Sequence, residues 1–502
     1  MQTQPSKSVV AETSAGNDAA PSLTALQNAA EFVGRHIGPD EKQIQSMLAE
    51  LGLDSLEALI AETVPAAIAL EEPLTLGEAM TEEAALARLK SLGAQNQLQR
   101  SFIGLGYYDT LIPNVILRNV LENPGWYTAY TPYQPEISQG RLECLLNFQQ
   151  MILDMTAMDL ANASLLDEAT AAAEAMALAK RVSKNRVANK FFVHRHCFPQ
   201  TIDVIKTRAE RFGFELVIGD LDDLNCAEVF GALFQYPDVT GKARDLESLI
   251  DELHEAKAIA VVAADLMSLA MLKPPGEMGA DVVLGNSQRF GVPMGYGGPH
   301  AAYFATKDEF KRAVPGRIIG VSVDSRGKAA YRMALQTREQ HIRREKANSN
   351  ICTAQVLLAN ISALYAMYHG PQGIRCIAER IHRLTRILAT GLQQQGLQLL
   401  NSNFFDTLSI EVDAGAAADI QARADQAGVN LRTGEMALPG SIGISLDECS
   451  TGEDVLTLWS VLTGKTQDTS LIESFDNAII AGNEPTVIPE ALQRQSNFLS
   501  HP

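Results

Sequence analysis

Neither long apolar runs nor paired cysteines occur in this chain of 502 residues. A transmembrane helix needs roughly 18 or more consecutive apolar residues, and no such run is present, so the sequence predicts no membrane-spanning helix. The six cysteines are widely separated, without a CxxC pair or the spacing of metal ligands: Cys144, Cys197, Cys226, Cys352, Cys376 and Cys449. This distribution argues against a disulfide framework and is typical of reduced thiols, so we expect a cytoplasmic protein.

Positive charge is also scarce. The chain has 41 Lys and Arg residues against 60 Asp and Glu residues, which gives a formal net charge of −19 at pH 7. Such a balance disfavours nucleic acid and anionic membranes as partners, because both repel an acidic protein. The hydrophobic content of 46% is ordinary for a globular protein, and the chain is too long for a single core. We therefore expect two or three domains.

The first 100 residues lack the alternation of strands and helices that is found further along the chain. Residues 1–30 are rich in Ala, Ser, Thr and Gln, with Lys7 as their only base. They have neither an apolar signal core nor an Arg-rich amphipathic pattern, so they predict a disordered tail. Residues 31–100 carry apolar side chains at helical spacing and predict a helical N-terminal extension.

Residues 101–350 predict a large α/β domain that opens with a tyrosine-rich segment, residues 101–140. Short apolar segments then alternate with helical ones and predict strands at 191–193, 215–218, 229–234, 258–264, 281–284 and 301–304. Nearly all-apolar strands separated by helices indicate a doubly wound, mostly parallel sheet that is covered on both faces. Residues 351–463 predict a helical region and a small α+β domain, and residues 464–502 predict a linker or tail.

Five stretches of the chain resemble the P-protein of the glycine cleavage system, the family of decarboxylating glycine dehydrogenases. They read FVGRHIGP (32–39), FIGLGYY (102–108), YTPYQPEISQG (130–140), NSQRFGVPMGYGGP (286–299) and QTREQHIRREK (336–346). Their order and spacing resemble the N-terminal half of that family across residues 31–500.

The resemblance implies the fold-type-I architecture of pyridoxal phosphate-dependent transferases, with a small C-terminal α+β domain and a helical N-terminal extension. In this family two homologous halves, fused or separate, form the active dimeric unit. Together they decarboxylate glycine with pyridoxal 5'-phosphate as the electron sink, and they pass the aminomethyl group to the lipoyl group of H-protein. The implied partners are therefore glycine, lipoylated H-protein and a second half of the P-protein.

The lysine that would anchor pyridoxal phosphate is missing. Asp265 follows an apolar strand and fits the aspartate that keeps the pyridine nitrogen protonated, although aspartate is also a common cap at strand ends. Counted back from the glycines at 297–298, the lysine position falls on Gln288. Counted forward from Asp281, it falls on Arg289. Neither side chain forms an imine, so we expect the cofactor to be anchored on the partner half and not covalently on this chain.

Acidic residues stand where active relatives would bind the cofactor phosphate at a helix N-terminus. Asp167 is the predicted cap of an Ala-rich helix that runs to Val182, and Glu168 follows it. Both carboxylates would repel a phosphate dianion. The sequence therefore predicts that this helix no longer holds a cofactor phosphate.

The tyrosine-rich segment supplies the candidate catalytic residues, which are Tyr107, Tyr108, Tyr130, Tyr133 and Glu136. Under the resemblance, the phenols would line the glycine and lipoyl channel of the partner half, where they donate hydrogen bonds and exclude water. Glu136 would orient a donor or take part in proton transfer. The alternative is a set of aromatic side chains that fill an interface between two domains.

Two hypotheses from different classes follow. In the first, the chain is an enzyme component that works with a lysine-bearing second half. In the second, it is a non-catalytic structural or regulatory partner. Residues 488–496 and 499–502 resemble the connector into the second half of fused P-proteins, which favours the first hypothesis. The basic segment 326–346 would either contact a phosphate, a carboxylate or acidic H-protein, or form a solvated surface.

Overall fold

The computed structural model describes residues 20–501, apart from residues 24–25, 27–30, 71, 73, 78, 129–131, 337–339, 341, 343, 348–350, 352–354 and 485. Two units make up the chain, Met1–Leu98 and Gln99–Pro502. In the described part of the chain, no helix combines the length and the apolar character needed to cross a membrane.

The first unit is a series of capped helices: α2 Glu31–His36, α3 Glu41–Leu51, α4 Leu56–Thr63 and α5 Glu82–Gly93. Helix α3 begins at a capping box in which Asp40 and Gln43 each accept the backbone N–H of the other, and it ends at Gly52 in the left-handed region. Leu48 is the one fully buried hydrophobic side chain among the described residues of this unit. Its helices are therefore stabilised mainly by local caps.

The second unit is built around a seven-stranded sheet of order β2-β8-β7-β6-β5-β3-β4. Its strands are β2 Leu160–Ala161, β3 Lys190–His194, β4 Glu215–Gly219, β5 Val229–Tyr236, β6 Ile259–Ala264, β7 Val282–Asn286 and β8 Ala302–Thr306. Strands β3 to β7 are mutually parallel, and β8 is antiparallel to both of its neighbours. The mostly parallel sheet that the sequence predicts is thus confirmed.

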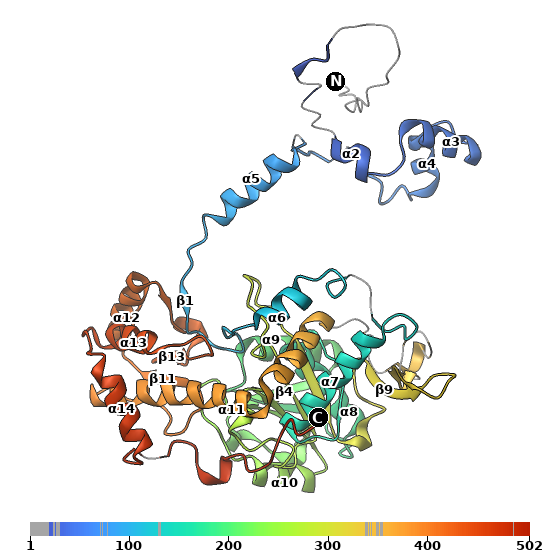
Figure 1. Ribbon diagram of the computed structural model, residues 1–502. Coiled ribbons are helices and arrows are strands. Elements are labelled where there is room, and N and C mark those ends of the chain that lie inside the picture. The colour runs from blue at the N-terminus through green and yellow to red at the C-terminus, as the bar shows by residue number, and fades with distance from the viewer. Residues whose placement is uncertain are drawn as a thin grey trace. The chain divides into compact units, whose positions relative to one another are not determined.

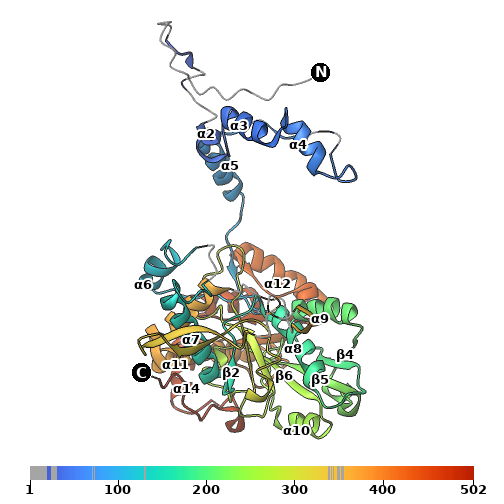
Figure 2. The ribbon, with the colours of Figure 1, turned by 90° about the vertical axis from the view of Figure 1, so that its right-hand side faces the viewer.

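Helices cover both faces of this sheet, because successive strand side chains point to opposite sides and both sets are apolar. The even-numbered residues of β6 share a core with α7 (Gln139–Thr156), α10 (Glu247–Glu255) and α11 (Val356–Gln394). Its odd-numbered residues share a second core with α8 (Glu168–Val182) and α9 (Pro199–Phe212). Figure 2 shows α8 and α9 beside the strands β4 and β5.

Smaller elements complete the second unit (Figure 1). A hairpin is formed by β9 (Ile318–Val323) and β10 (Ala329–Ala334), and the tyrosine-rich segment contains α6 (Asn114–Ile116) and a π-helical turn (Leu117–Leu121). The small α+β part pairs β11 (Thr407–Glu411) with β13 (Ser441–Ser445) next to α12 (Ala414–Ala427) and α13 (Gly452–Thr463). Strand β1 (Arg100–Ser101) joins it by pairing with β12 (Val429–Asn430).

The segment after α13 is more ordered than the linker or tail expected for residues 464–502. It contains helix α14 (Ser470–Ile480) and buries the side chains Phe475, Ile488, Leu492 and Phe498. Arg494 is buried as well and donates to the carbonyl oxygens of Met155 (2.7 Å), Leu269 (2.9 Å) and Asp154 (2.7 Å). Such single anchors leave no periodic pattern in the sequence, which is why the packing was not foreseen.

The Arg494 anchor leads to a stability prediction. Replacing Arg494 by alanine should lower the free energy of unfolding by about 2–4 kcal/mol, because three charge-assisted hydrogen bonds are lost and the carbonyl groups lose their donor. Urea unfolding followed by circular dichroism measures this change. Arg211→Ala is the matched control, since the Arg211 side chain is 78% exposed and should cost less than about 0.5 kcal/mol. Equal values for the two variants would contradict the anchoring role.

Candidate functional site

A buried arginine lies in the loop between β7 and β8. Arg289 is 4% exposed, and its Nη1 donates to Asp265 Oδ2 at 2.7 Å and also to Asp406 Oδ2. Its guanidinium carbon lies 3.8 Å from the centre of the Tyr108 ring. Burial disfavours the charged guanidinium, but Asp265 and Asp406 overcompensate and the pKa of Arg289 is raised. Arg289 is therefore a fixed cation between two carboxylates.

Gln288, beside Arg289, is fully buried and holds the tyrosine-rich segment. Its Nε2 donates to the carbonyl oxygens of Tyr108 and Val292, both at 2.7 Å, and its Oε1 accepts the N–H of Tyr108 at 3.2 Å. Both positions considered for the cofactor lysine are thus engaged in protein contacts. The residues present do not fit pyridoxal phosphate: the carboxylate of Asp265 that would face the pyridine nitrogen is paired with Arg289 instead.

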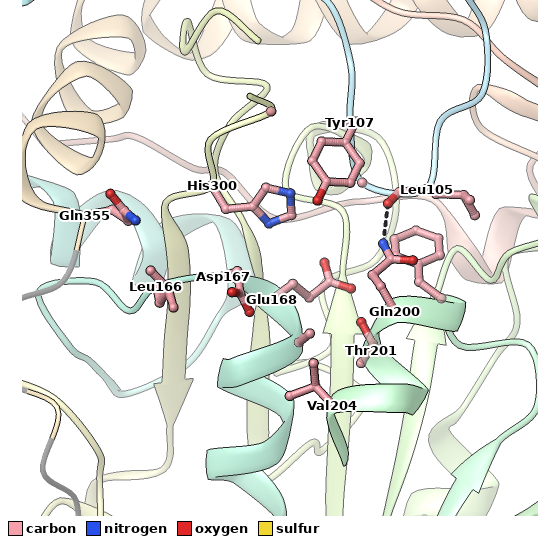
Figure 3. Close-up of a pocket in the computed structure, with 14 residues that line it drawn as sticks. Leu105, Tyr107, Leu166, Asp167, Glu168, Gln200, Thr201, Val204, His300 and Gln355 are labelled. Carbon is pink, nitrogen blue, oxygen red and sulfur yellow. Dashed lines mark hydrogen bonds between the residues drawn. The ribbon is translucent and has the colours of Figure 1, made fainter. Parts of the chain in front are cut away.

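A pocket of about 280 Å³ opens beside the first turns of α8 and α9 (Figure 3). Figure 3 shows the side chains of Glu168, His300 and Tyr107 pointing toward one another in it. It is lined by Leu105, Gly106, Tyr107, Leu166, Asp167, Glu168, Ala169, Phe198, Gln200, Thr201, Val204, Gly298, His300 and Gln355. Five separate segments of the second unit therefore form its wall.

A helix cap and two glycines position the segments that line this pocket. Asp167 caps α8, and its Oδ1 accepts the N–H of Thr170 at 2.6 Å. The loop that carries Tyr107 needs glycine at position 104, because φ is +71° there and a Cβ atom would lie 2.1 Å from Ser445 Oγ. Gly298 is similar, since a Cβ atom at this positive φ would lie 2.7 Å from the Tyr107 ring. These two glycines let Tyr107 enter the pocket.

Two buried side chains in the pocket, Glu168 and His300, have shifted pKa values. Burial raises the pKa of Glu168 to about 8, with Asp265 and Asp167 adding to the rise and Gln235 opposing it. Burial also lowers the pKa of His300. At neutral pH, Glu168 is therefore mostly a neutral acid and His300 a neutral imidazole. Glu168 therefore adds little to the negative charge that was expected at the start of α8.

The predicted tyrosines have different surroundings. Tyr107 is 39% exposed, lines the pocket and has its ring centre 4.6 Å from that of His300. Tyr108 is buried against Arg289. Tyr133 is buried with its ring 5.9 Å from the Arg317 guanidinium, and Glu136 is exposed; neither lines the pocket. Tyr130 lies outside the described residues.

Two important residues were missed by reasoning from the sequence. Asp406 lies 117 positions from Arg289, and nothing in the sequence links the two. His300 directly follows Gly297, Gly298 and Pro299, and its place after this glycine-rich turn was a usable signal. The two acids at 167 and 168 were recognised, but their different protonation depends on burial and was not foreseen.

The sheet order, the aspartate at the end of β6 and the β7–β8 loop that faces it define the fold class. This is the fold of the type-I pyridoxal phosphate-dependent transferases. A ureidoglycine-glyoxylate aminotransferase from Bacillus subtilis shares it with a TM-score of 0.51 at 13% identity, over 77% of this chain and 99% of that chain.

Within this class, the chain belongs to the glycine cleavage system P-protein family, whose model matches residues 34–462. It is 62% identical over 481 residues to the glycine dehydrogenase (decarboxylating) of Idiomarina loihiensis. This match covers 96% of this chain and 49% of that protein. A crystal structure of an inhibitor-bound glycine decarboxylase (P-protein) matches with a TM-score of 0.76 at 33% identity, over 86% of this chain and 99% of that chain. The chain spans about half the length of the curated relatives it matches.

Proposed function

We propose that this chain is the N-terminal half of a glycine decarboxylase. With a lysine-bearing second half, it takes part in the decarboxylation of glycine and in the transfer of the aminomethyl group to the lipoyl group of H-protein. The observation that carries this proposal is the Arg289 cluster: Asp265, which we assign as the cofactor aspartate of the fold, is paired with an arginine. Pyridoxal phosphate is then anchored on the second half, and the chain alone is inactive.

In this proposal the chain contributes binding surface and positioning. Tyr107, Tyr130, Tyr133 and Glu136 belong to the segment that lines the channel of the second half, where phenols exclude water and donate hydrogen bonds. Tyr108 has a different role, since its ring packs on the Arg289 guanidinium and its backbone is held by Gln288. It positions the segment that carries its neighbours.

The partners in this proposal are the second half, glycine and lipoylated H-protein, and neither nucleic acid nor a membrane is a partner. A cytoplasmic location also belongs to the proposal, and it agrees with the five described cysteines, all of which are free.

The test compares the chain alone with the chain mixed with a second half. The C-terminal half of the Idiomarina loihiensis relative is a suitable second half, because its N-terminal half is 62% identical to this chain. Alone with pyridoxal phosphate, the chain should gain no violet absorbance of a lysine-bound cofactor and should catalyse no glycine-dependent CO2 exchange with H-protein. The mixture should catalyse this exchange above the level of the second half by itself.

Both outcomes of this experiment are decisive. Absorbance and exchange by the chain alone would contradict the proposal that the cofactor is anchored elsewhere. A mixture that associates but stays at the level of the second half would instead support a structural or regulatory partner.

A further inference from the structure

The pocket beside α8 and α9 contains polar atoms without partners. Glu168 (5% exposed), Thr201 (1%) and His300 (8%) are each more than nine-tenths buried and line the cavity. Glu168 Oε1, Thr201 Oγ1 and both ring nitrogens of His300 have no hydrogen-bond partner. Burying polar atoms without hydrogen-bond partners costs free energy. A polar ligand that hydrogen-bonds to these atoms would remove that cost.

The charged residues of the pocket indicate the sign of the charge that its ligand carries. Its acidic residues are Asp167 and Glu168, and among the described residues that line it there is neither a lysine nor an arginine. An anion would therefore meet carboxyl groups without a compensating cation. A cation would satisfy Asp167 and would also stabilise the ionised form of Glu168. The described lining therefore favours a positively charged ligand over phosphate and carboxylate compounds.

The size of the pocket, its lining and its hydrogen-bond acceptors indicate which kind of cation it would bind. A primary ammonium has three N–H donors, and three separate side chains offer acceptors here: Glu168, Thr201 and the neutral His300. The Tyr107 ring next to His300 adds an aromatic surface that attracts cations. Leu105, Phe198 and Val204 offer apolar contacts for a short alkyl chain. A volume of about 280 Å³ suits a small molecule only.

We propose that this pocket binds a small protonated primary amine, whose ammonium donates to Glu168, Thr201 and His300 while its alkyl chain packs on Leu105 and Phe198. The ligand is held by this chain alone, so the inference goes beyond the proposed function and does not depend on a second half. The first turn of α8, where relatives would bind a cofactor phosphate, thus forms part of a site that prefers a cation to an anion.

Binding of the amine is coupled to a proton. Because the pKa of Glu168 is raised to about 8, the free pocket holds this carboxyl group mostly protonated at neutral pH. An ammonium next to it favours the carboxylate, so binding releases up to one proton. The ionisable groups that interact with Glu168 from the surrounding elements are Asp167, Cys197, Asp265 and Tyr303, and Tyr107 and His300 share its pocket.

Calorimetric titration of the whole chain with ethylamine hydrochloride at constant ionic strength tests the proposal. We expect saturable binding at one site near pH 7. The observed heat should differ between phosphate and HEPES buffers, because a released proton is taken up with a different ionisation enthalpy in each. Tetramethylammonium, which has no N–H donor, and sodium acetate should bind at least about tenfold more weakly.

Variants separate this site from unspecific binding. Glu168→Gln should weaken ethylamine binding at least about tenfold and should remove the buffer-dependent heat. Thr201→Val should weaken binding and leave the buffer-dependent heat in place. Glu210→Gln is the control, since this side chain is 69% exposed and should change nothing. Circular dichroism checks that each variant is folded.

Several results would overturn the proposal. These are the absence of saturable ethylamine binding by the unaltered chain, equal affinity for tetramethylammonium, or saturable binding of acetate in the same pocket. Retention of both affinity and proton release by Glu168→Gln would also overturn it.

Discussion

Replacing Arg289 with methionine should lower the free energy of unfolding of this chain by about 3–5 kcal/mol, among the largest effects of any single substitution. The change removes the cation shared by Asp265 and Asp406 and leaves two buried carboxylates without compensation. Arg289→Lys should cost less, because an ammonium keeps the charge, although it cannot reproduce the planar stacking on Tyr108. Urea unfolding of both variants measures the two costs.

The exposed Arg195 provides a matched control for Arg289. It also lies between two aspartates, Asp220 at 3.2 Å and Asp223 at 3.6 Å, but its side chain is 50% exposed. Arg195→Met should therefore cost less than about 1 kcal/mol. Adding Asp265→Asn to Arg289→Met should recover part of the stability, because one of the uncompensated charges is removed. A cost for Arg289→Met no larger than for Arg195→Met would contradict the charge-cluster interpretation.

Replacing Glu168 with glutamine should stabilise the chain, and the gain should grow with pH. Burial raises the pKa of Glu168 from 4.5 to about 8, so between these values the unfolded chain releases a proton that the folded chain keeps. Stability contributed by this group is therefore lost as pH rises from about 4.5 to about 8, at about 1.36 kcal/mol per pH unit. The gain for Glu168→Gln should be near zero at pH 4.5, about 3 kcal/mol at pH 7 and about 4–5 kcal/mol above pH 8.

Urea unfolding at about pH 5, 7 and 8.5 measures this trend. Glu210→Gln serves again as the control and should show no pH-dependent difference from the unaltered chain, because its carboxyl group is largely exposed. A constant difference between Glu168→Gln and the unaltered chain at all three pH values would mean that Glu168 titrates normally in the folded state. Stabilisation by removal of a buried ionisable group is expected where that group serves binding instead of folding.

The sheet could be predicted from the sequence because its strands are short, apolar and separated by helices. Residues 258–264, for example, were predicted as a strand, and β6 spans Ile259–Ala264. The same apolar pattern places Asp265 at the strand end. The sequence also shows that neither Gln288 nor Arg289 can form an imine, since residue identity alone decides this.

Other features had no counterpart in the local sequence. Residues 464–502 look polar and aperiodic, yet Arg494 and a few apolar side chains hold the segment against the rest of the second unit. Tyr107 and Tyr108 are neighbours in the sequence, but one lines an open pocket and the other packs under a buried guanidinium. Such differences depend on contacts with residues far along the chain.

The sequence by itself determined the doubly wound sheet and the family, and it showed that neither Gln288 nor Arg289 can form an imine, because periodicity and residue identity are local properties. Only the tertiary structure decided which contacts Arg289 makes and how deeply Glu168 is buried. Asp406, 117 positions from Arg289 in the sequence, pairs with it and forms one charge cluster with Arg289 and Asp265. Burial raises the pKa of Glu168 to about 8, so this residue is a neutral acid at neutral pH and not the repelling carboxylate that was expected. Both outcomes depend on the local environment of a charge, which is fixed by the folded structure.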